Sequence, residues 1–174
     1  MSDNNNPDEI ELKHFFKDLE DYKSFLNKAP KKSWTKTRDL SGGRKSTYLP
    51  FPYQQALADK IFREFDVIRE HYDLFVNEMM CTVTIQYLPD YPHAEQRIMT
   101  GTAFKPAMME AGSAASKFPV GKITNSLEYN GPNARSAAIS NALMTLGNVF
   151  GRNLSRKDFA ANYQLEEKKK DEQP

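Results

Sequence analysis

The sequence predicts an α+β fold in which a small antiparallel β-sheet, or hairpin, packs on helices. Apolar residues recur at helical spacing in three stretches, 9–26, 53–72 and 131–159. Between the second and third stretches, residues 81–88 alternate apolar and polar side chains, which is typical of a strand with one covered face. The turn-forming "PDYPHA" then leads to residues 96–105, so the two segments are expected to form a hairpin.

The first predicted helix ends before Pro30, because proline cannot continue a helix. A basic segment containing Trp34 follows and is expected as a loop or an irregular strand. Gly42 and Gly43 then permit a tight turn or a close backbone approach, and the β-prone residues 45–49 predict a short strand.

The remaining elements are justified by proline and glycine positions. A proline pair precedes the second predicted helix, and Pro132 and Asn133 stand near the predicted start of the third. Gly101 lies inside the second strand of the hairpin, where it indicates a bulge or a close approach by other backbone. Small residues at 107–116 predict a mobile loop before the last helix.

The length and composition are those of one globular domain. The chain has 174 residues, 39% hydrophobic and 27% charged. We expect a single domain over 9–162, with disordered ends at 1–8 and 163–174. No apolar run approaches the ~20 residues that cross a bilayer, and the acidic N-terminus does not resemble a signal peptide, so a cytoplasmic protein without membrane contact is expected.

Cysteine and histidine usage predicts no metal and no cofactor. Cys81 is the single cysteine and lies among alternating apolar residues, so we interpret it as a buried small hydrophobe. His14, His71 and His93 show neither an H-x-x-x-H nor an H-E-x-x-H spacing.

The positive charge is concentrated in one segment, although the net charge is only +1. Between positions 28 and 45 there is one acidic residue, Asp39, against seven basic ones. Clustered basic residues favour a polyanion, since they neutralise phosphates and release counterions. A solvated linker is the competing interpretation. The seven residues are Lys28, Lys31, Lys32, Lys36, Arg38, Arg44 and Lys45.

The stretch "DLSGGRKSTYL" at 39–49 does not fit a nucleotide-binding phosphate loop. That loop requires G-x-x-x-x-G-K-[ST] between a strand and a helix. Lys45 and Ser46 match its end, but Arg44 and Asp39 occupy the two glycine positions, and no apolar strand precedes the stretch. ATP binding is therefore not predicted here.

Two stretches resemble the Rad fifty-two family of single-strand annealing proteins. "RDLSGGRKSTYLPFPYQQALADKIF" resembles the start of that family's annealing domain, with an arginine, a glycine turn, a basic residue and an aromatic before a helix. "SAAISNALMTLGNVFGRNLSRKDF" resembles its helix ending in "L-x-x-F-G-N-x-L-G" and a "K-D-Y" step. The resemblance covers roughly 38–160. The matching positions of the second stretch are Leu143, Gly147, Asn148, Gly151, Lys157, Asp158 and Phe159.

This resemblance implies an ATP-independent protein that forms a homo-oligomeric ring, binds single-stranded DNA in a basic groove and anneals complementary strands in homologous recombination and DNA repair. A single-strand-binding protein is a further expected partner. The short chain is more like the versions found in phages and mobile elements. Arg38 and Tyr48 fall on DNA-contacting positions of the family and Lys45 on a basic strand position. The full set of expected nucleic-acid-binding residues is Lys36, Arg38, Arg44, Lys45, Tyr48, Lys117, Lys122, Arg135, Ser140, Asn141, Arg152, Arg156 and Lys157.

One departure from the family concerns the long helix. The family carries a Lys-Arg pair and a further arginine there, whereas this chain has Ser140, Asn141 and Met144. Either the groove is weaker, or other residues supply the charge. The candidates for that role are Arg135, Lys117, Lys122 and Arg152.

Two other functions stay open. An oligomeric nucleic-acid binder without annealing activity, acting on RNA or as a recombination mediator, would use the same basic segment. An enzyme would need a cluster of carboxylates or an activated nucleophile. Asp66, Asp73, Asp90 and Glu95 are spread over the chain in a way more typical of solvated residues, so we expect no enzyme.

Overall fold

The computed structural model describes residues 13–39, 41–75, 78–108, 122–123 and 125–154. The predicted disordered ends and the predicted site residues Lys117, Arg156 and Lys157 lie outside these residues. The elements, in chain order, are α1 (Leu19–Asn27), η1 (Lys32–Trp34), β1 (Lys36–Asp39), η2 (Ser41–Gly43), β2 (Lys45–Tyr48), α2 (Phe51–Ile61), β3 (Phe62–Phe75), β4 (Glu78–Pro89), β5 (Arg97–Pro106), α3 (Ser126–Leu146) and η4 (Asn148–Phe150).

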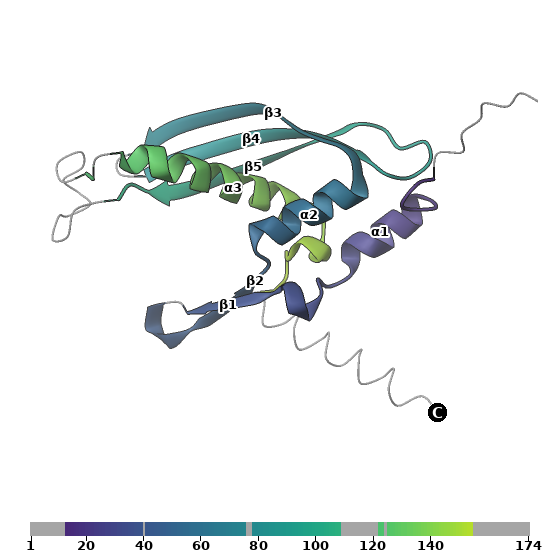
Figure 1. Cartoon of the computed structure of the whole chain (residues 1–174), viewed down its shortest axis with the longest axis horizontal. Helices are drawn as coiled ribbons and strands as arrows, with labels where there is room; N and C mark the ends of the chain where they lie inside the picture. Colours follow the sequence, from purple (N-terminus) through teal and green to yellow (C-terminus); the bar gives the residue numbers. More distant parts are fainter. Residues whose placement is uncertain (1–12, 40, 76–77, 109–121, 124, 155–174) are drawn as a thin grey trace, which may run out of the picture.

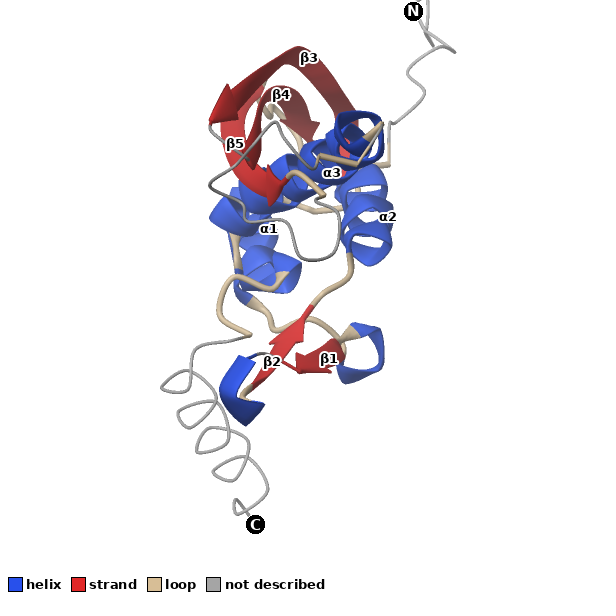
Figure 2. Ribbon diagram, turned by 90° about the vertical axis from the view of Figure 1, so that its left-hand side faces the viewer, coloured by secondary structure: helices blue, strands red, loops and turns tan. Residues whose placement is uncertain are grey.

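The architecture is α+β, with two small antiparallel sheets (Figure 1). Strands β3, β4 and β5 form one sheet in chain order, and α3 packs along one of its faces. Strands β1 and β2 form a separate hairpin that lies apart from this sheet, as the side view also shows (Figure 2). The prediction of an α+β chain with small antiparallel sheets is confirmed.

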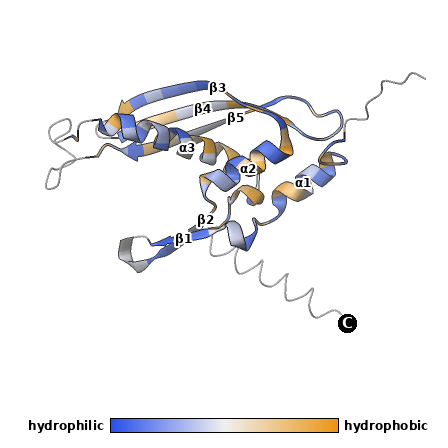
Figure 3. Cartoon of the chain, in the orientation of Figure 1, coloured by the Kyte–Doolittle hydropathy of each residue, from blue (hydrophilic) through white to orange (hydrophobic). Residues whose placement is uncertain are grey.

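The core lies between the three-stranded sheet and the helices. Alternate residues of β4 (Cys81, Val83 and Ile85) are fully buried, which confirms the predicted alternation. They pack with Ile61 of α2 and Leu143 of α3 in one apolar cluster. The hairpin strands, in contrast, are hydrophilic and largely exposed (Figure 3). Within the described residues, no helix is long and apolar enough to cross a membrane.

The second predicted helix was wrong over its C-terminal half. The helix ends at Ile61, and residues 62–75 form strand β3 instead. Phe65 and Val67 pair with Tyr87 and Ile85 of β4, so their two-residue alternation is that of a strand. The apolar residues of this segment continue the helical spacing of α2 by chance. The segment forms a strand rather than a helix because it pairs with β4.

Gly101 marks the closest approach of α3 to the sheet. A Cβ atom at this position would lie 2.1 Å from the carbonyl oxygen of Ala138 and 2.7 Å from the amide nitrogen of Ala142. The register of β5 with β4 shows no shift at this residue. Of the two predicted roles for Gly101, close backbone approach is therefore the one observed.

Helix α3 begins earlier than predicted, at Ser126, so that Pro132 lies inside it. The residue before a proline is disfavoured in a helix partly because its Cβ meets the proline ring, and here that residue is Gly131. The helix ends at Leu146, before the extended residue Gly147, and the predicted stripe residues Val149 and Phe150 lie in η4, still buried.

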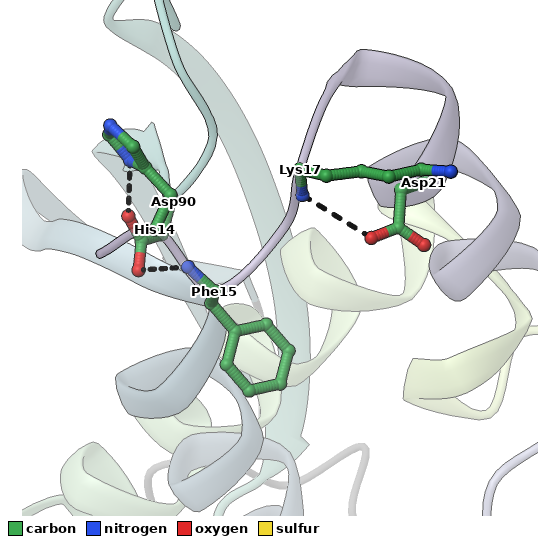
Figure 4. A network of polar contacts seen from close by, with 5 residues as sticks. All are labelled: His14, Phe15, Lys17, Asp21 and Asp90. Carbon is green, nitrogen blue, oxygen red and sulfur yellow. Dashed lines mark hydrogen bonds and ion pairs between the residues drawn. The ribbon is translucent and has the colours of Figure 1, made fainter. Parts of the chain in front are cut away.

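Helix α1 is shorter than predicted because Asp18 caps it, accepting a hydrogen bond from the Asp21 amide. The preceding residues are held by Asp90, which follows β4 (Figure 4). The Asp90 carboxylate accepts hydrogen bonds from Nδ1 of His14 at 2.9 Å and from the amide of Phe15 at 3.0 Å. The N-terminal segment is thus anchored to the turn after β4.

Candidate nucleic-acid interface

A cleft of about 560 Å³ lies between the β1–β2 hairpin, strand β5 and helix α3. We refer to it as the hairpin cleft. One wall comes from the hairpin and the start of α2, another from β5, and the third from α3 and the residues after η4. Its lining residues are Arg38, Ser46, Thr47, Tyr48, Leu49, Gln54, Thr102, Ala103, Phe104, Lys105, Ala137, Ser140, Asn141, Met144, Gly151 and Arg152.

The charge of the hairpin cleft has one sign. Among the residues that the structure describes, its lining contains three cations, Arg38, Lys105 and Arg152, and neither aspartate nor glutamate. The cations come from three different elements of the wall, whereas α3 contributes only neutral side chains. A concave surface with unopposed positive charge concentrates anionic ligands.

The hairpin presents Arg38 and Tyr48 together. The Arg38 guanidinium carbon lies 5.4 Å from the centre of the Tyr48 ring, a cation–π contact. Residues Gly42 and Gly43 make the turn that joins the strands, with φ values of 75° and 71°, which confirms the predicted tight turn. This arrangement places a cation and an aromatic ring side by side in the cleft wall.

Lys45 and Lys36 are exposed on the same hairpin but do not line the cleft. Arg38 is paired with Ser46, and Asp39 with Lys45, so Arg38 and Lys45 lie on opposite faces of the two-stranded ribbon. Arg44, just before β2, is exposed at the tip of the hairpin. Three of the predicted basic residues therefore lie on the hairpin without lining the cleft.

Three predicted residues, Ser140 and Asn141 of α3 and Arg152 of the segment after it, do line the cleft. Asn141 donates a hydrogen bond from Nδ2 to the carbonyl oxygen of Thr102 at 2.8 Å, which ties α3 to β5. Arg152 donates from Nε to the carbonyl oxygen of Met144 at 2.8 Å, at the C-terminal end of α3. This bond fixes the stem of Arg152 at the edge of the cleft, where Ser140 also lies.

Two other candidate cations lie elsewhere. Arg135 faces β3, where its Nε is 2.5 Å from Oε1 of Glu70, and it lines a smaller cavity of about 290 Å³ with Asp59 and Asp66. Lys122 is half-buried in the segment before α3 and is not part of the cleft lining. Of the residues named as substitutes for the missing basic pair, Arg152 is the one that the described structure brings into the cleft.

Lys105 and Gln54 are among the lining residues that sequence reasoning missed. Lys105 ends a predicted strand, and nothing in its neighbourhood marks it as a site residue. Gln54 is 1% exposed, and its Nε2 donates to the carbonyl oxygen of Phe150 at 2.8 Å. Its polar side chain on the buried stripe of a predicted helix was the available signal, since buried polar groups are seldom without a purpose.

The groups with shifted pKa values lie outside the hairpin cleft. Burial raises the pKa of the Cys81 thiol and of the Tyr22 and Tyr87 hydroxyls. Burial and the neighbouring Cys81 raise the pKa of Tyr72 to about 12. The part of the chain that the structure describes contains no group of three or more His, Cys, Asp or Glu side chains that could hold a metal ion.

No family model matches this chain, and no curated protein matches it.

Proposed function

We propose that this protein binds single-stranded DNA in the hairpin cleft and anneals complementary strands without ATP. The observation that carries the proposal is the described lining of the cleft, with three cations, the Tyr48 ring held by Arg38, and no carboxylate among these residues. Arginine and lysine neutralise phosphates, and an aromatic side chain offers a stacking surface, which together are typical of single-strand binding.

The position of the cations suits a flexible strand. Arg38, Lys105 and Arg152 stand on separate walls, and the side chains between them on α3, Ser140 and Asn141, are neutral hydrogen-bonding groups. A single strand can bend its backbone from one cation to the next, because it is not held in a duplex. Within the described part of this lining, no nucleophile is paired with a base, so the function proposed is positioning of strands rather than bond cleavage.

A ring of identical subunits completes the proposal. Among the described strands, β3 and β5 each pair with β4 alone, so each leaves one edge of the sheet open. An open edge can pair with a second copy, and head-to-tail pairing generates a ring when the rotation closes. Cleft residues of successive subunits would then form a continuous groove, as the family resemblance implies.

The direct test is strand annealing, followed by energy transfer between two complementary labelled oligonucleotides without nucleotide or metal. We expect the protein to accelerate annealing, and the Arg38→Ala, Lys105→Ala double variant to lose most of that acceleration. Lys23→Ala is the matched control, since Lys23 lies on α1 and pairs with Glu20.

Two outcomes would count against the proposal. Binding without faster annealing would favour an oligomeric nucleic-acid binder that acts on RNA or loads another protein. Acceleration that survives the double variant would show that strands anneal at another surface of the protein.

A further inference from the structure

An aromatic stack lies outside the hairpin cleft, at the base of the hairpin. Trp34 of η1 and Tyr53 of α2 have ring centres 5.9 Å apart and planes inclined by 12°. The Lys31 ammonium nitrogen lies 5.2 Å from the centre of the Trp34 ring. We call the surface formed by these three residues the aromatic platform.

The aromatic platform is not part of the apolar core. Trp34 is half-buried and Tyr53 is exposed, and neither belongs to the core cluster or to the residues packed against it. An aromatic pair that serves only the core would be covered by other apolar side chains. The rings of this pair therefore offer surface to a ligand.

The charge around the platform is positive. Lys31, Lys32 and Lys36 are exposed within six residues of one another, and none forms an ion pair with any of the residues that the structure describes. Stacked rings beside unpaired cations suit a ligand that has both flat aromatic groups and negative charges, and single-stranded nucleic acid is such a ligand.

The platform adjoins the hairpin cleft through neighbouring residues. Tyr53 is the platform residue on α2, and the next residue, Gln54, lines the cleft. Lys36 is the register partner of Tyr48, which lines the cleft as well. The platform and one wall of the cleft therefore share α2, and the hairpin begins two residues after Trp34.

We propose that the aromatic platform stacks a base of the strand that leaves the hairpin cleft. This inference rests on the proposed function, since it requires a single strand in the cleft. The Lys31 ammonium, which covers the Trp34 ring in the free protein, transfers to a phosphate, and the base takes its place on the ring. The platform binds bases of any sequence, because every base has an aromatic face.

Trp34 makes the proposal testable by fluorescence, since it is the chain's single tryptophan. The probes are a thymidine oligonucleotide and an abasic oligonucleotide of the same length and charge. We expect the thymidine strand to quench Trp34 emission strongly at saturation, and the abasic strand to bind through its phosphates with little quenching. Equal quenching by the two strands, or none by either at saturation, overturns the proposal.

Substitutions separate this inference from the proposed function. Tyr53→Ala and Trp34→Ala should weaken binding of the thymidine strand about 5- to 150-fold and leave abasic binding unchanged, with Tyr53→Phe as the ring-preserving control. Arg38→Ala with Lys105→Ala should weaken the binding of both strands. If the platform variants weaken binding of neither strand, or of both strands equally, the platform proposal is wrong while the cleft proposal stands. If the wild type binds neither strand, both proposals fail.

Discussion

Arg38 makes a local contact that prepares its side chain for the proposed binding of a phosphate. Its guanidinium is held over the Tyr48 ring before any ligand is present, so little side-chain entropy remains to be lost on binding a phosphate. Both residues were expected from the family resemblance, because they fall on its DNA-contacting positions. Lys105 could not be predicted in the same way, because its place in the cleft depends on contacts far along the chain.

Tyr22 gives a prediction about pH at the residue scale. Its side chain is 2% exposed, its hydroxyl has no partner in the described part of the chain, and burial raises its pKa above the ordinary value of about 10. Above pH 10 the unfolded chain releases this proton while the folded chain retains it. The stability that Tyr22 contributes is therefore fully present below about pH 10 and is lost as the pH rises further.

The measurement is urea unfolding of the wild type and of Tyr22→Phe at pH 8 and pH 11. We expect the variant to be at least as stable at pH 8, since it removes a buried hydroxyl without a partner. Between the two pH values the wild type should lose more stability, at up to about 1.4 kcal/mol per pH unit. Equal losses in the two proteins would show that the Tyr22 hydroxyl ionises as easily in the folded chain.

Strand β3 and helix α3 show what a pattern predicts and where it stops. The alternation of β4 predicted its strand because each second residue is buried against helices. Residues 62–72 of β3 were predicted as helix, since their apolar residues continue the spacing of α2, and only the pairing with β4 distinguishes the two. The early start of α3 was missed because Pro132 is an ordinary helix-start signal that here lies inside the helix.

The contact between β5 and α3 gives a prediction at the scale of elements. Gly101→Ala places a Cβ 2.1 Å from the Ala138 carbonyl oxygen, so the backbone of α3 has to move. We expect a loss of about 3 kcal/mol in the free energy of unfolding, at the upper end of ordinary overpacking. Thr100→Ala is the control, because this exposed side chain lies on the same strand and its truncation adds no atom. Similar unfolding midpoints for the two variants would contradict the close approach.

The hairpin cleft forms only when separate parts of the chain come together in the folded molecule. Its lining comes from four separate parts of the chain: the hairpin with the start of α2, strand β5, helix α3 and the residues after η4. The sequence predicted residues from three of these parts, through the charge cluster and the family resemblance. It could not predict that β5 would add Lys105, nor that Arg135 would face Glu70 across the other side of α3.

This assembly places positive charge in the proposed groove although α3 has Ser140, Asn141 and Met144 where the family that the sequence resembles has cations. Lys105 and Arg152 place positive charge beside the neutral side chains of α3, from a strand and from the segment after η4. Arg38 supplies the opposite wall. The proposed groove is thus built by elements that meet only in the folded chain.

The salt dependence of single-strand binding tests this account most directly. Affinity for a thymidine oligonucleotide is measured over a range of salt for the wild type, for Arg38→Ala with Lys105→Ala, and for the Lys23→Ala control. Each lost phosphate contact lowers the magnitude of the logarithmic slope by about 0.7, so the double variant should lose about 1.4, and the control should keep the wild-type slope. A double variant with the wild-type affinity and slope would contradict the hairpin cleft as the binding site.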